Sequence, residues 1–226
     1  MPCILHIETS TSACSVALSA AGELLFDKVS LSEQSHSTSA GVFVQSALSA
    51  NASFRPDAIA VSIGPGSYTG LRIGLSLAKG LTFGYNIPLI AVPTLAILAS
   101  RAIKQVGGDE ASLYCPMLDA RRMEVYAAVY DSHLAERREV RADILGAETY
   151  LPYLDTRLYI FGNGSLKYKS ILPHPNAIFL DVLYPVASDM ISLAEASYAN
   201  KTFIDPAYSE PFYLKDFQAT VPKNKI

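Results

Sequence analysis

Blocks of apolar residues alternate with polar turns along the start of this chain, as in an α/β protein. Apolar runs at 3–7 and 14–18 flank a polar turn and predict a β-hairpin, and a run at 24–29 predicts another strand. A serine-rich turn leads into 37–50, which predicts a helix of about fourteen residues capped by Ser35 or Ser37. The pattern therefore predicts strands first and then a helix.

A glycine-rich loop joins the next predicted strand to the next predicted helix. The β-branched run 58–63 enters the loop 64–70, GPGSYTG, and a helical rhythm resumes over 71–83. A strand at 89–92 then leads through Pro93 and Thr94 into a helix that reaches about residue 104, and Gly107 and Gly108 are typical of a linker. We therefore expect an N-terminal lobe at 1–106 and a C-terminal lobe at 107–226.

The second half of the chain repeats the first half weakly. Residues 118–119 and 125–129 parallel 7–8 and 14–18, because in both an acidic residue ends a strand, a short turn follows and a second strand begins. Residues 59–66 find a similar match in 158–164. Two such parallels in the same order predict two related lobes. A helix at about 188–200, which we expect to pack back on the first lobe, and an aromatic segment at 211–214 complete the pattern.

Composition narrows the class of protein. Charged residues make up 17% of the 226 residues, which is low for a soluble domain and predicts that a partner covers part of the surface. The N-terminus has no signal-peptide pattern and no apolar run reaches membrane-spanning length, so we expect a cytoplasmic protein without a membrane association. The odd set of cysteines, Cys3, Cys14 and Cys115, favours buried reduced thiols. A net charge of -3 argues against autonomous binding of nucleic acid.

Two loops of the first lobe are candidate anion sites. The turn that begins Glu8, Thr9, Ser10 offers hydroxyls and backbone N–H groups, although serine and threonine are also common in ordinary turns. The glycine loop, with a predicted cap at Thr69, lies where a helix N-terminus favours negative charge. It has neither a Walker lysine nor dinucleotide-binding spacing. The alternative is a tight turn that needs backbone freedom. The candidate residues are Glu8, Thr9, Ser10, Gly64, Gly66, Ser67, Tyr68 and Thr69.

Four sequence blocks resemble the TsaB family, also called YeaZ. They are ILHIETST at 4–11, GPGSYTGLRIG at 64–74, MLDARR with EVYA at 117–127, and FYLK at 212–215. The resemblance spans nearly the whole chain and implies an actin-like ATPase (ASKHA, RNase H-like) α/β fold of two related lobes, each a mixed sheet flanked by helices. It also implies a non-catalytic subunit that binds and activates TsaD, which with TsaE and ATP modifies the adenosine beside the tRNA anticodon.

The chain departs from the catalytic TsaD pattern at the metal site. TsaD-like enzymes carry an HxxxH pair, whereas 92–100 has no histidine here, and His6, His36, His133 and His174 are far apart in sequence. We therefore expect no metal, no catalytic residue and no cofactor of this chain's own, ATP being used by the complex. The turn Arg121, Arg122, Met123 is bulky where a nucleotide-binding relative has glycines. It is either a solvated basic turn, which we favour, or a side-chain contact to phosphate.

The predicted helices at 37–50 and 69–83 carry only two charges, Arg72 and Lys79. A surface helix normally has a charged outer face, so these helices are either enclosed in the core or covered by a partner. The resemblance favours a partner: a TsaD-like subunit, a second copy when the chain is alone, and, within the complex, a TsaE-like ATPase and tRNA. The predicted contact residues are Ala40, Phe43, Val44, Ala47, Leu48, Gly70, Leu71, Arg72, Gly74, Leu75 and Ala78.

Three enzyme classes remain as alternatives. The first-lobe loops leave open an ATP-binding or ATP-hydrolysing ASKHA enzyme, with weak nucleotide binding undecided, and the fold also occurs in sugar and acetate kinases. A glycoprotease-like peptidase has less support, because Ser67 is not central in GSYTG as the nucleophile is in GxSxG. An activator without catalysis is the reading we favour.

Overall fold

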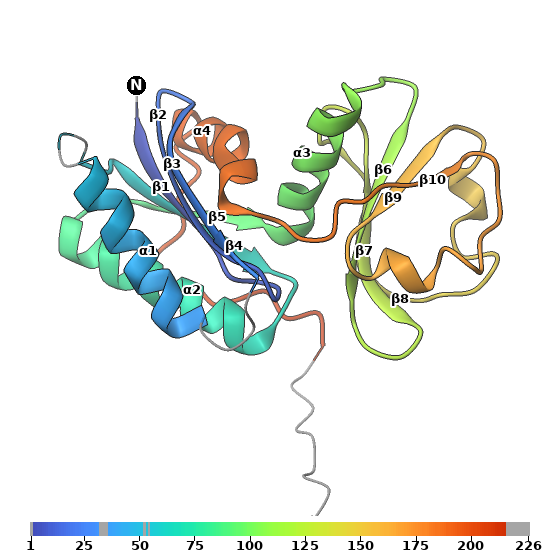
Figure 1. Ribbon diagram of the computed structural model, residues 1–226, viewed down its shortest axis with the longest axis horizontal. Helices are drawn as coiled ribbons and strands as arrows, with labels where there is room; N and C mark the ends of the chain where they lie inside the picture. The colour runs from blue at the N-terminus through green and yellow to red at the C-terminus, as the bar shows by residue number, and fades with distance from the viewer. Residues whose placement is uncertain (1, 32–35, 52, 54, 216–226) are drawn as a thin grey trace, which may run out of the picture.

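The computed structural model describes all residues except 1, 32–35, 52, 54 and 216–226, and it contains two five-stranded sheets (Figure 1). In the first sheet the order is β3-β2-β1-β4-β5. Strands β1 (Cys3–Glu8), β2 (Cys14–Ala20) and β3 (Glu23–Ser30) form an antiparallel meander. Strands β4 (Ala58–Gly64) and β5 (Leu89–Pro93) continue the sheet in parallel with β1. The predicted hairpin and strands of the first lobe are all present.

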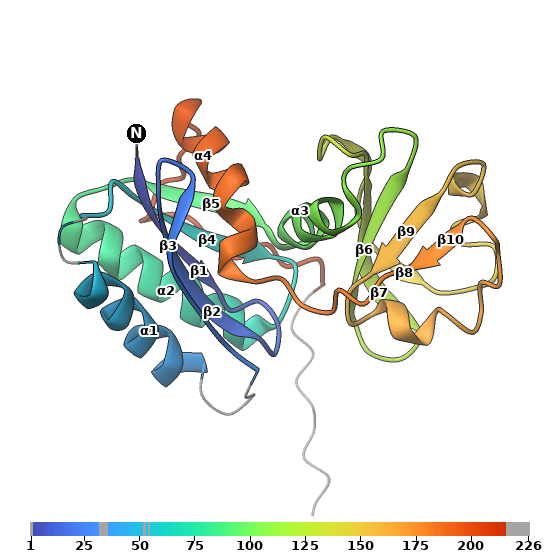
Figure 2. The ribbon, with the colours of Figure 1, turned by 45° about the horizontal axis from the view of Figure 1, so that its top comes forward.

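Helices cover both faces of the first sheet, as Figures 1 and 2 show. Helices α1 (His36–Ala50) and α2 (Tyr68–Tyr85) lie on one face and enclose a core that includes Leu5, Val16 and Val61. On the other face, the short helix η3 (Ala187–Met190) and α4 (Ile191–Ala199) pack against β1 and β5. The helix expected at 188–200 thus returns from the end of the chain to the first lobe.

The second sheet has the same strand order as the first. Its order is β8-β7-β6-β9-β10, with an antiparallel meander followed by two parallel strands. The strands are β6 (Leu113–Asp119), β7 (Glu124–Tyr130), β8 (Glu136–Ile144), β9 (Leu158–Phe161) and β10 (Ala177–Phe179). The prediction of an actin-like fold with two related lobes is therefore confirmed.

The second lobe differs in its connections. Where the first lobe has α1 and α2, the second has only the 3-10 turns η1 (Leu151–Tyr153) and η2 (Ser165–Lys167) among the described residues. Strands β8 and β10 were not predicted from the sequence. The run ERREVRADI that forms β8 carries charges along an exposed edge of the sheet, so it lacks the apolar pattern of a buried strand.

Helix α3 (Thr94–Val106) lies between the two sheets (Figure 1). Its apolar residues Leu95, Leu98 and Ala102 join Tyr114 and Phe161 of the second sheet in one core cluster. The same helix also contacts β4 and β5 of the first sheet. The expected boundary at residue 106 thus falls at the end of a helix that both lobes share. Cys3, Cys14 and Cys115 are free and buried, and no described helix is long and apolar enough to cross a membrane.

Candidate functional site

The β1–β2 turn and the glycine loop are locked together. The Ser67 backbone N–H donates to the Ser10 carbonyl at 2.6 Å, and the Thr9 hydroxyl donates to the Gly70 carbonyl at 2.8 Å. A Cβ atom added at Gly66 would lie 2.4 Å from the Ser10 carbonyl oxygen, and one at Gly70 would lie 2.0 Å from that of Thr9. These glycines are therefore needed for contact between two segments of the chain itself.

The start of α2 is satisfied by its own cap. The Ser67 hydroxyl accepts a hydrogen bond from the Gly70 N–H at 3.2 Å, so the cap is Ser67 and the predicted cap at Thr69 is wrong. The side chains of Ser67 and Thr69 are exposed, whereas Gly64 is buried. The proposed caps Ser35 and Ser37 of α1 lie outside the residues whose side chains are described.

A carboxylate of the chain occupies the place that an external anion was expected to take. Glu8 ends β1 fully buried, and its Oε1 accepts a hydrogen bond from the Ser10 N–H at 2.6 Å. Thr9 and Ser10 are also buried. The turn thus uses the Ser10 N–H internally, and an anion site built from these residues stays a prediction.

Burial perturbs the ionisation of Glu8 and of a second carboxyl group nearby. Loss of solvation raises the pKa of Glu8 to about 7, against the lowering effect of hydrogen bonds with Ser10 and Ser62, and the negative charge of Asp189 raises it further. Desolvation also raises the pKa of Asp189 to about 6, although Arg101 lies 3.9 Å away. Burial therefore reduces the negative charge of both carboxyl groups at mildly acidic pH. Among the described residues, no cluster of three or more side chains suited to a metal ion was found.

Most of the residues predicted to contact a partner lie inside the chain's own core. Ala40, Phe43, Val44, Ala47, Leu71, Leu75 and Ala78 are each less than 10% exposed, and Gly70 and Gly74 are buried. Leu48 is partly buried, and only Arg72 is exposed. The list is therefore wrong as a set of surface contacts, because α1 and α2 turn these small and apolar residues toward the sheet.

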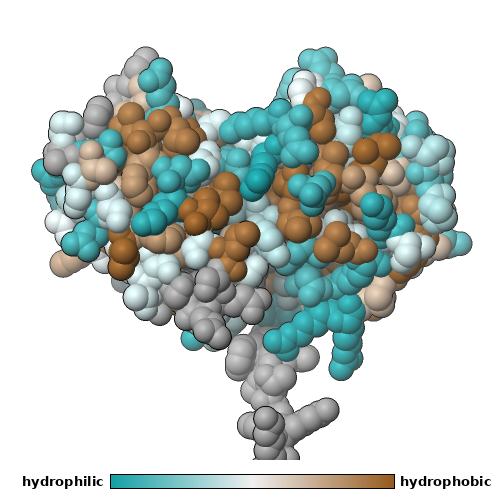
Figure 3. Space-filling view, in the orientation of Figure 1, coloured by the Kyte–Doolittle hydropathy of each residue, from teal (hydrophilic) through white to brown (hydrophobic). Residues whose placement is uncertain are grey.

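The outer face of α1 and α2 is formed by different residues. Phe83 is 91% exposed and Val42 is 48% exposed, and the other exposed positions between them carry no acidic group. These positions are Thr38, Gln45, Ser49, Ala50, Thr69, Arg72, Ser76, Gly80 and Gly84. In Figure 3, apolar, weakly polar and hydrophilic residues are interspersed over this lobe. We call this surface, Val42 and Phe83 with the polar positions around them, the helix face.

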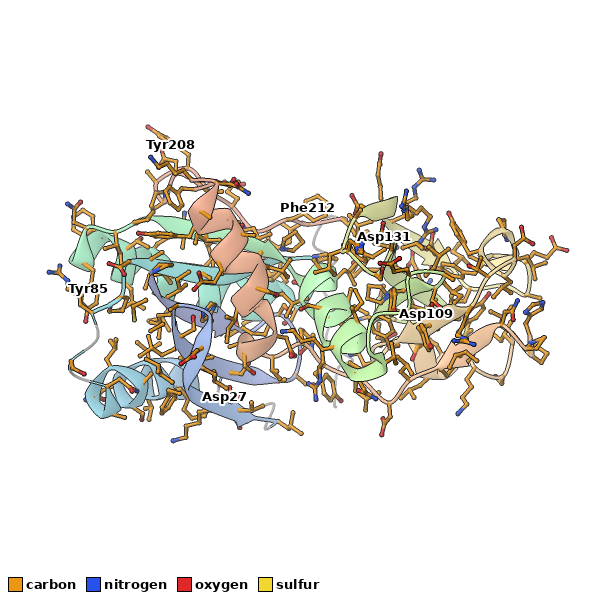
Figure 4. All side chains as sticks on the ribbon, turned by 90° about the horizontal axis from the view of Figure 1, so that it is seen from above. Asp27, Tyr85, Asp109, Asp131, Tyr208 and Phe212 are labelled. Atoms are coloured by element: carbon orange, nitrogen blue, oxygen red, sulfur yellow. The ribbon has the colours of Figure 1, made fainter. Side chains whose placement is uncertain are left out.

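The C-terminal segment connects the glycine loop to the second lobe. The Phe212 N–H donates to the Ile63 carbonyl at 2.7 Å, and Figure 4 labels Phe212 where the segment passes between the lobes. The Tyr213 hydroxyl accepts from Arg72 Nε at 3.1 Å, and its ring lies 4.9 Å from that of Tyr68. Lys215 then forms an ion pair with Glu124 of β7. The aromatic run at 211–214 was the sequence signal for this segment, but its partners were not predictable.

The peptidase alternative has no support in the placement of the described histidines. His6 is buried on β1, where its Nε2 lies 2.8 Å from the Ser19 hydroxyl, as expected for a core histidine. His133 pairs with Glu110, and His174 accepts a hydrogen bond from the Asn176 N–H. The side chain of His36 lies outside the described residues. Ser67 is a helix cap whose hydroxyl accepts a hydrogen bond.

Comparison with known proteins identifies the family. Residues 30–152, just over half of the chain, match the family model of TsaD, tRNA N6-adenosine threonylcarbamoyltransferase. The chain is 32% identical over 222 residues to the tRNA threonylcarbamoyladenosine biosynthesis protein TsaB of Escherichia coli, with 94% of each chain covered. It is 29% identical to TsaB of Haemophilus influenzae, over 94% of this chain and 93% of that protein. YeaZ from Pseudomonas aeruginosa superposes with a TM-score of 0.84 at 29% identity, over 95% of this chain and all of that one. The chain belongs to the TsaB family.

Proposed function

We propose that this chain is a non-catalytic subunit that binds and activates a TsaD-like threonylcarbamoyltransferase in the biosynthesis of tRNA threonylcarbamoyladenosine. The pathway follows from the names of its relatives in Escherichia coli and Haemophilus influenzae. In the proposed complex a TsaE-like ATPase uses ATP, tRNA is bound by the assembly, and the chain alone forms a homodimer through the same surface. We place this complex in the cytoplasm.

The observation that carries the proposal is the helix face, which exposes Val42 and Phe83 among weakly polar residues and carries no acidic group. Contact between apolar surface and water is unfavourable. Phe83 is 91% exposed, so a partner that covers its ring gains free energy of association. The two cations of α2 do not counter this, because Lys79 Nζ donates to the Ser209 carbonyl at 2.7 Å and Arg72 is engaged by Tyr213. Lys79 is thus directed to the C-terminal segment, and the exposed Arg72 is held by Tyr213.

A TsaD-like subunit is the occupant we favour. The TsaD family model matches this chain over residues 30–152, which include both helices, so we expect the partner to have a related lobe with a corresponding pair of helices. Two such pairs of low-profile helices can pack into a four-helix contact between similar lobes. Packing against a related lobe thus favours the heterodimer. A second copy of this chain offers the same pair of helices, which favours a homodimer when the TsaD-like partner is absent.

The test is heterodimer formation with the cognate TsaD-like protein, using variants that the structure allows to fold. Phe83→Glu and Val42→Glu place a charge on the helix face without entering the core. Truncating or charging a central interface anchor typically costs about 2 kcal/mol or more, which is about thirtyfold in Kd. We expect wild type to form a one-to-one complex by light scattering and titration calorimetry, and each variant to bind at least about thirtyfold more weakly.

Ile144→Glu is the matched control, because Ile144 is 76% exposed on β8 of the second lobe. This variant should bind as wild type does. If all three substitutions weaken binding equally, the helix face is not the interface. Failure of wild type to bind, combined with ATP turnover by the chain alone, would replace the activator with the ATP-hydrolysing alternative.

A further inference from the structure

The turn between β6 and β7 holds two arginines in a backbone conformation that L-residues rarely adopt. Arg121 has φ 68° and Arg122 has φ 48°, both in the left-handed region. Each such residue costs free energy unless it is glycine, and strained positions of this kind concentrate at functional sites. Both side chains are exposed at the tip of the turn. The turn therefore keeps two arginines where asparagine or glycine would fold more easily.

The side chains of Lys167 and Asp119 hold this turn in place. Lys167 of η2 forms an ion pair with Asp119 and donates to the carbonyls of Arg122 at 2.8 Å and Glu124 at 2.6 Å. The Arg121 N–H donates to the Asp119 carboxylate at 3.2 Å. These bonds engage the backbone of the turn, while both arginine side chains are exposed. The backbone that carries the two arginine side chains is thus fixed by hydrogen bonds.

The carboxylates closest to the turn are already paired. Asp119 pairs with Lys167 and Glu124 with Lys215, whereas Arg121 and Arg122 form no ion pair within the described part of the chain. Elsewhere, Arg137, Arg138 and Arg157 each pair with an aspartate. Figure 3 shows hydrophilic side chains projecting at the lower end of the second lobe, where Figure 1 places this turn. Two uncompensated positive charges therefore face solvent together in a chain whose net charge is -3.

Aromatic rings lie along the C-terminal segment that reaches β7. Lys215 brings the C-terminal segment to β7, and two residues earlier Tyr213 packs against Tyr68 with the rings inclined by 31°. The Arg72 guanidinium lies 4.0 Å above the Tyr68 ring. Arginine forks match phosphate oxygens, and arginine with aromatic rings is the combination that binds the backbone and bases of unpaired nucleic acid.

We propose that Arg121 and Arg122 contact backbone phosphates of tRNA bound to the heterodimer. The inference rests on the function proposed above, since the net charge of the chain alone is unfavourable for binding RNA. A free nucleotide is a poorer fit, because the arginines lie at an exposed tip. The cavity of about 380 Å³ beside the C-terminal segment is lined by Ile63 and Tyr208 together with the acidic Asp205 and Glu210, and includes neither arginine.

The decisive variant is the double substitution Arg121→Asn with Arg122→Gly in the intact heterodimer. Asparagine and glycine tolerate the left-handed backbone, so Tm of the variant chain should rise by roughly 2–4 °C. Loss of two phosphate contacts should weaken binding of an unmodified tRNA transcript about tenfold near physiological salt. The slope of log affinity against log salt should become shallower by about 1.4. Fluorescence anisotropy over a range of KCl concentrations measures both quantities.

Lys104→Gln with Lys201→Gln is the matched control, since it removes two exposed positive charges outside the turn. It should leave the salt slope unchanged. If the heterodimer forms and the Asn/Gly variant is more stable but binds tRNA as wild type does, the arginines are only solvated and the inference is wrong. If the variant weakens ATP binding and leaves tRNA binding intact, the ligand is a nucleotide and the tRNA contact is rejected. If no heterodimer forms, the proposed function fails and this inference fails with it.

Discussion

Glu8 and His6 lie on the same buried strand, and burial shifts the pKa of each in opposite senses. Both side chains are fully buried, and desolvation disfavours the charged form of each. The pKa of Glu8 therefore rises to about 7, while that of His6 falls to about 3. Both residues are uncharged over much of the acidic pH range. At the residue scale, the centre of the first sheet is thus a neutral polar strand.

These shifts predict how stability depends on pH. The raised pKa of Glu8 adds stability that is complete below its unfolded value and is lost as pH rises through about 7. The depressed pKa of His6 acts in the opposite direction, and its effect fades as pH rises past the unfolded value of about 6.5. Between pH 6.5 and pH 8 the loss from Glu8, about 0.8 kcal/mol, exceeds the remaining gain from His6, about 0.4 kcal/mol, so wild type should lose about 0.4 kcal/mol of unfolding free energy.

Glu8→Gln removes the titrating group and should flatten this decline. Urea unfolding at pH 6.5, 7.25 and 8 measures it for both proteins, whatever the substitution does to absolute stability. The same decline in the variant would show that another group titrates in this range.

At the scale of elements, α2 is positioned by its contact with the β1–β2 turn. Gly70 lies against the Thr9 carbonyl, whereas Gly80 in the same helix has no atom within 4 Å of the place its Cβ would take. One glycine is thus required by packing and the other is a weak point of the helix.

Alanine at these two positions should have opposite effects. Gly70→Ala forces the helix away from the turn and should destabilise the protein by about 1–3 kcal/mol. Gly80→Ala should stabilise it by about 0.5–1 kcal/mol, because alanine has the higher helix propensity and room is available. Thermal and urea unfolding of both variants measure the difference. Equal effects of the two substitutions would contradict the packing argument.

The sequence predicted the elements of the first lobe better than the direction in which they face. Alternating apolar runs and glycine punctuation were enough to place β1, β2, β4 and α2. The fourteen positions 37–50 of α1 contain no charged residue to mark the outside, so Ala40 and Ala47 were assigned to a partner although they face the core. Likewise, the contact of Gly70 with Thr9 joins segments far apart in sequence, and no local pattern encodes it.

At the scale of the whole molecule, residues near the end of the chain complete the core of the first lobe. Met190 and Ala194 enter a core cluster with Ile4, Ala58 and Ile90 of the first sheet. The Ile204 N–H donates to the Leu89 carbonyl at 3.0 Å and extends the contact along β5. The first lobe is therefore built from two separate stretches of sequence, with the second lobe inserted between them.

A pair of identical substitutions on α4 tests this arrangement. Ala194 is fully buried, while Ala196, two residues further along the same helix, is exposed. Ala194→Glu buries an unpaired charge and should destabilise the protein by more than about 3 kcal/mol. Ala196→Glu should change stability by less than about 0.5 kcal/mol. Limited proteolysis of the first lobe and urea unfolding report the effect, and comparable stability of the two variants would show that α4 is not essential to the core.

The return of α4 has a consequence for biosynthesis. A growing chain leaves the ribosome N-terminus first, so strands β1 to β5 emerge long before the helix that covers their second face. Until η3 and α4 are made, Ile4, Ala58 and Ile90 lack Met190 and Ala194 and have only Ile97 of α3 as a helical neighbour in their core cluster, although every strand of that sheet is present. Completion of the first lobe must therefore wait for synthesis of the entire second lobe, and a nascent chain arrested in between carries an open apolar sheet face that chaperones recognise.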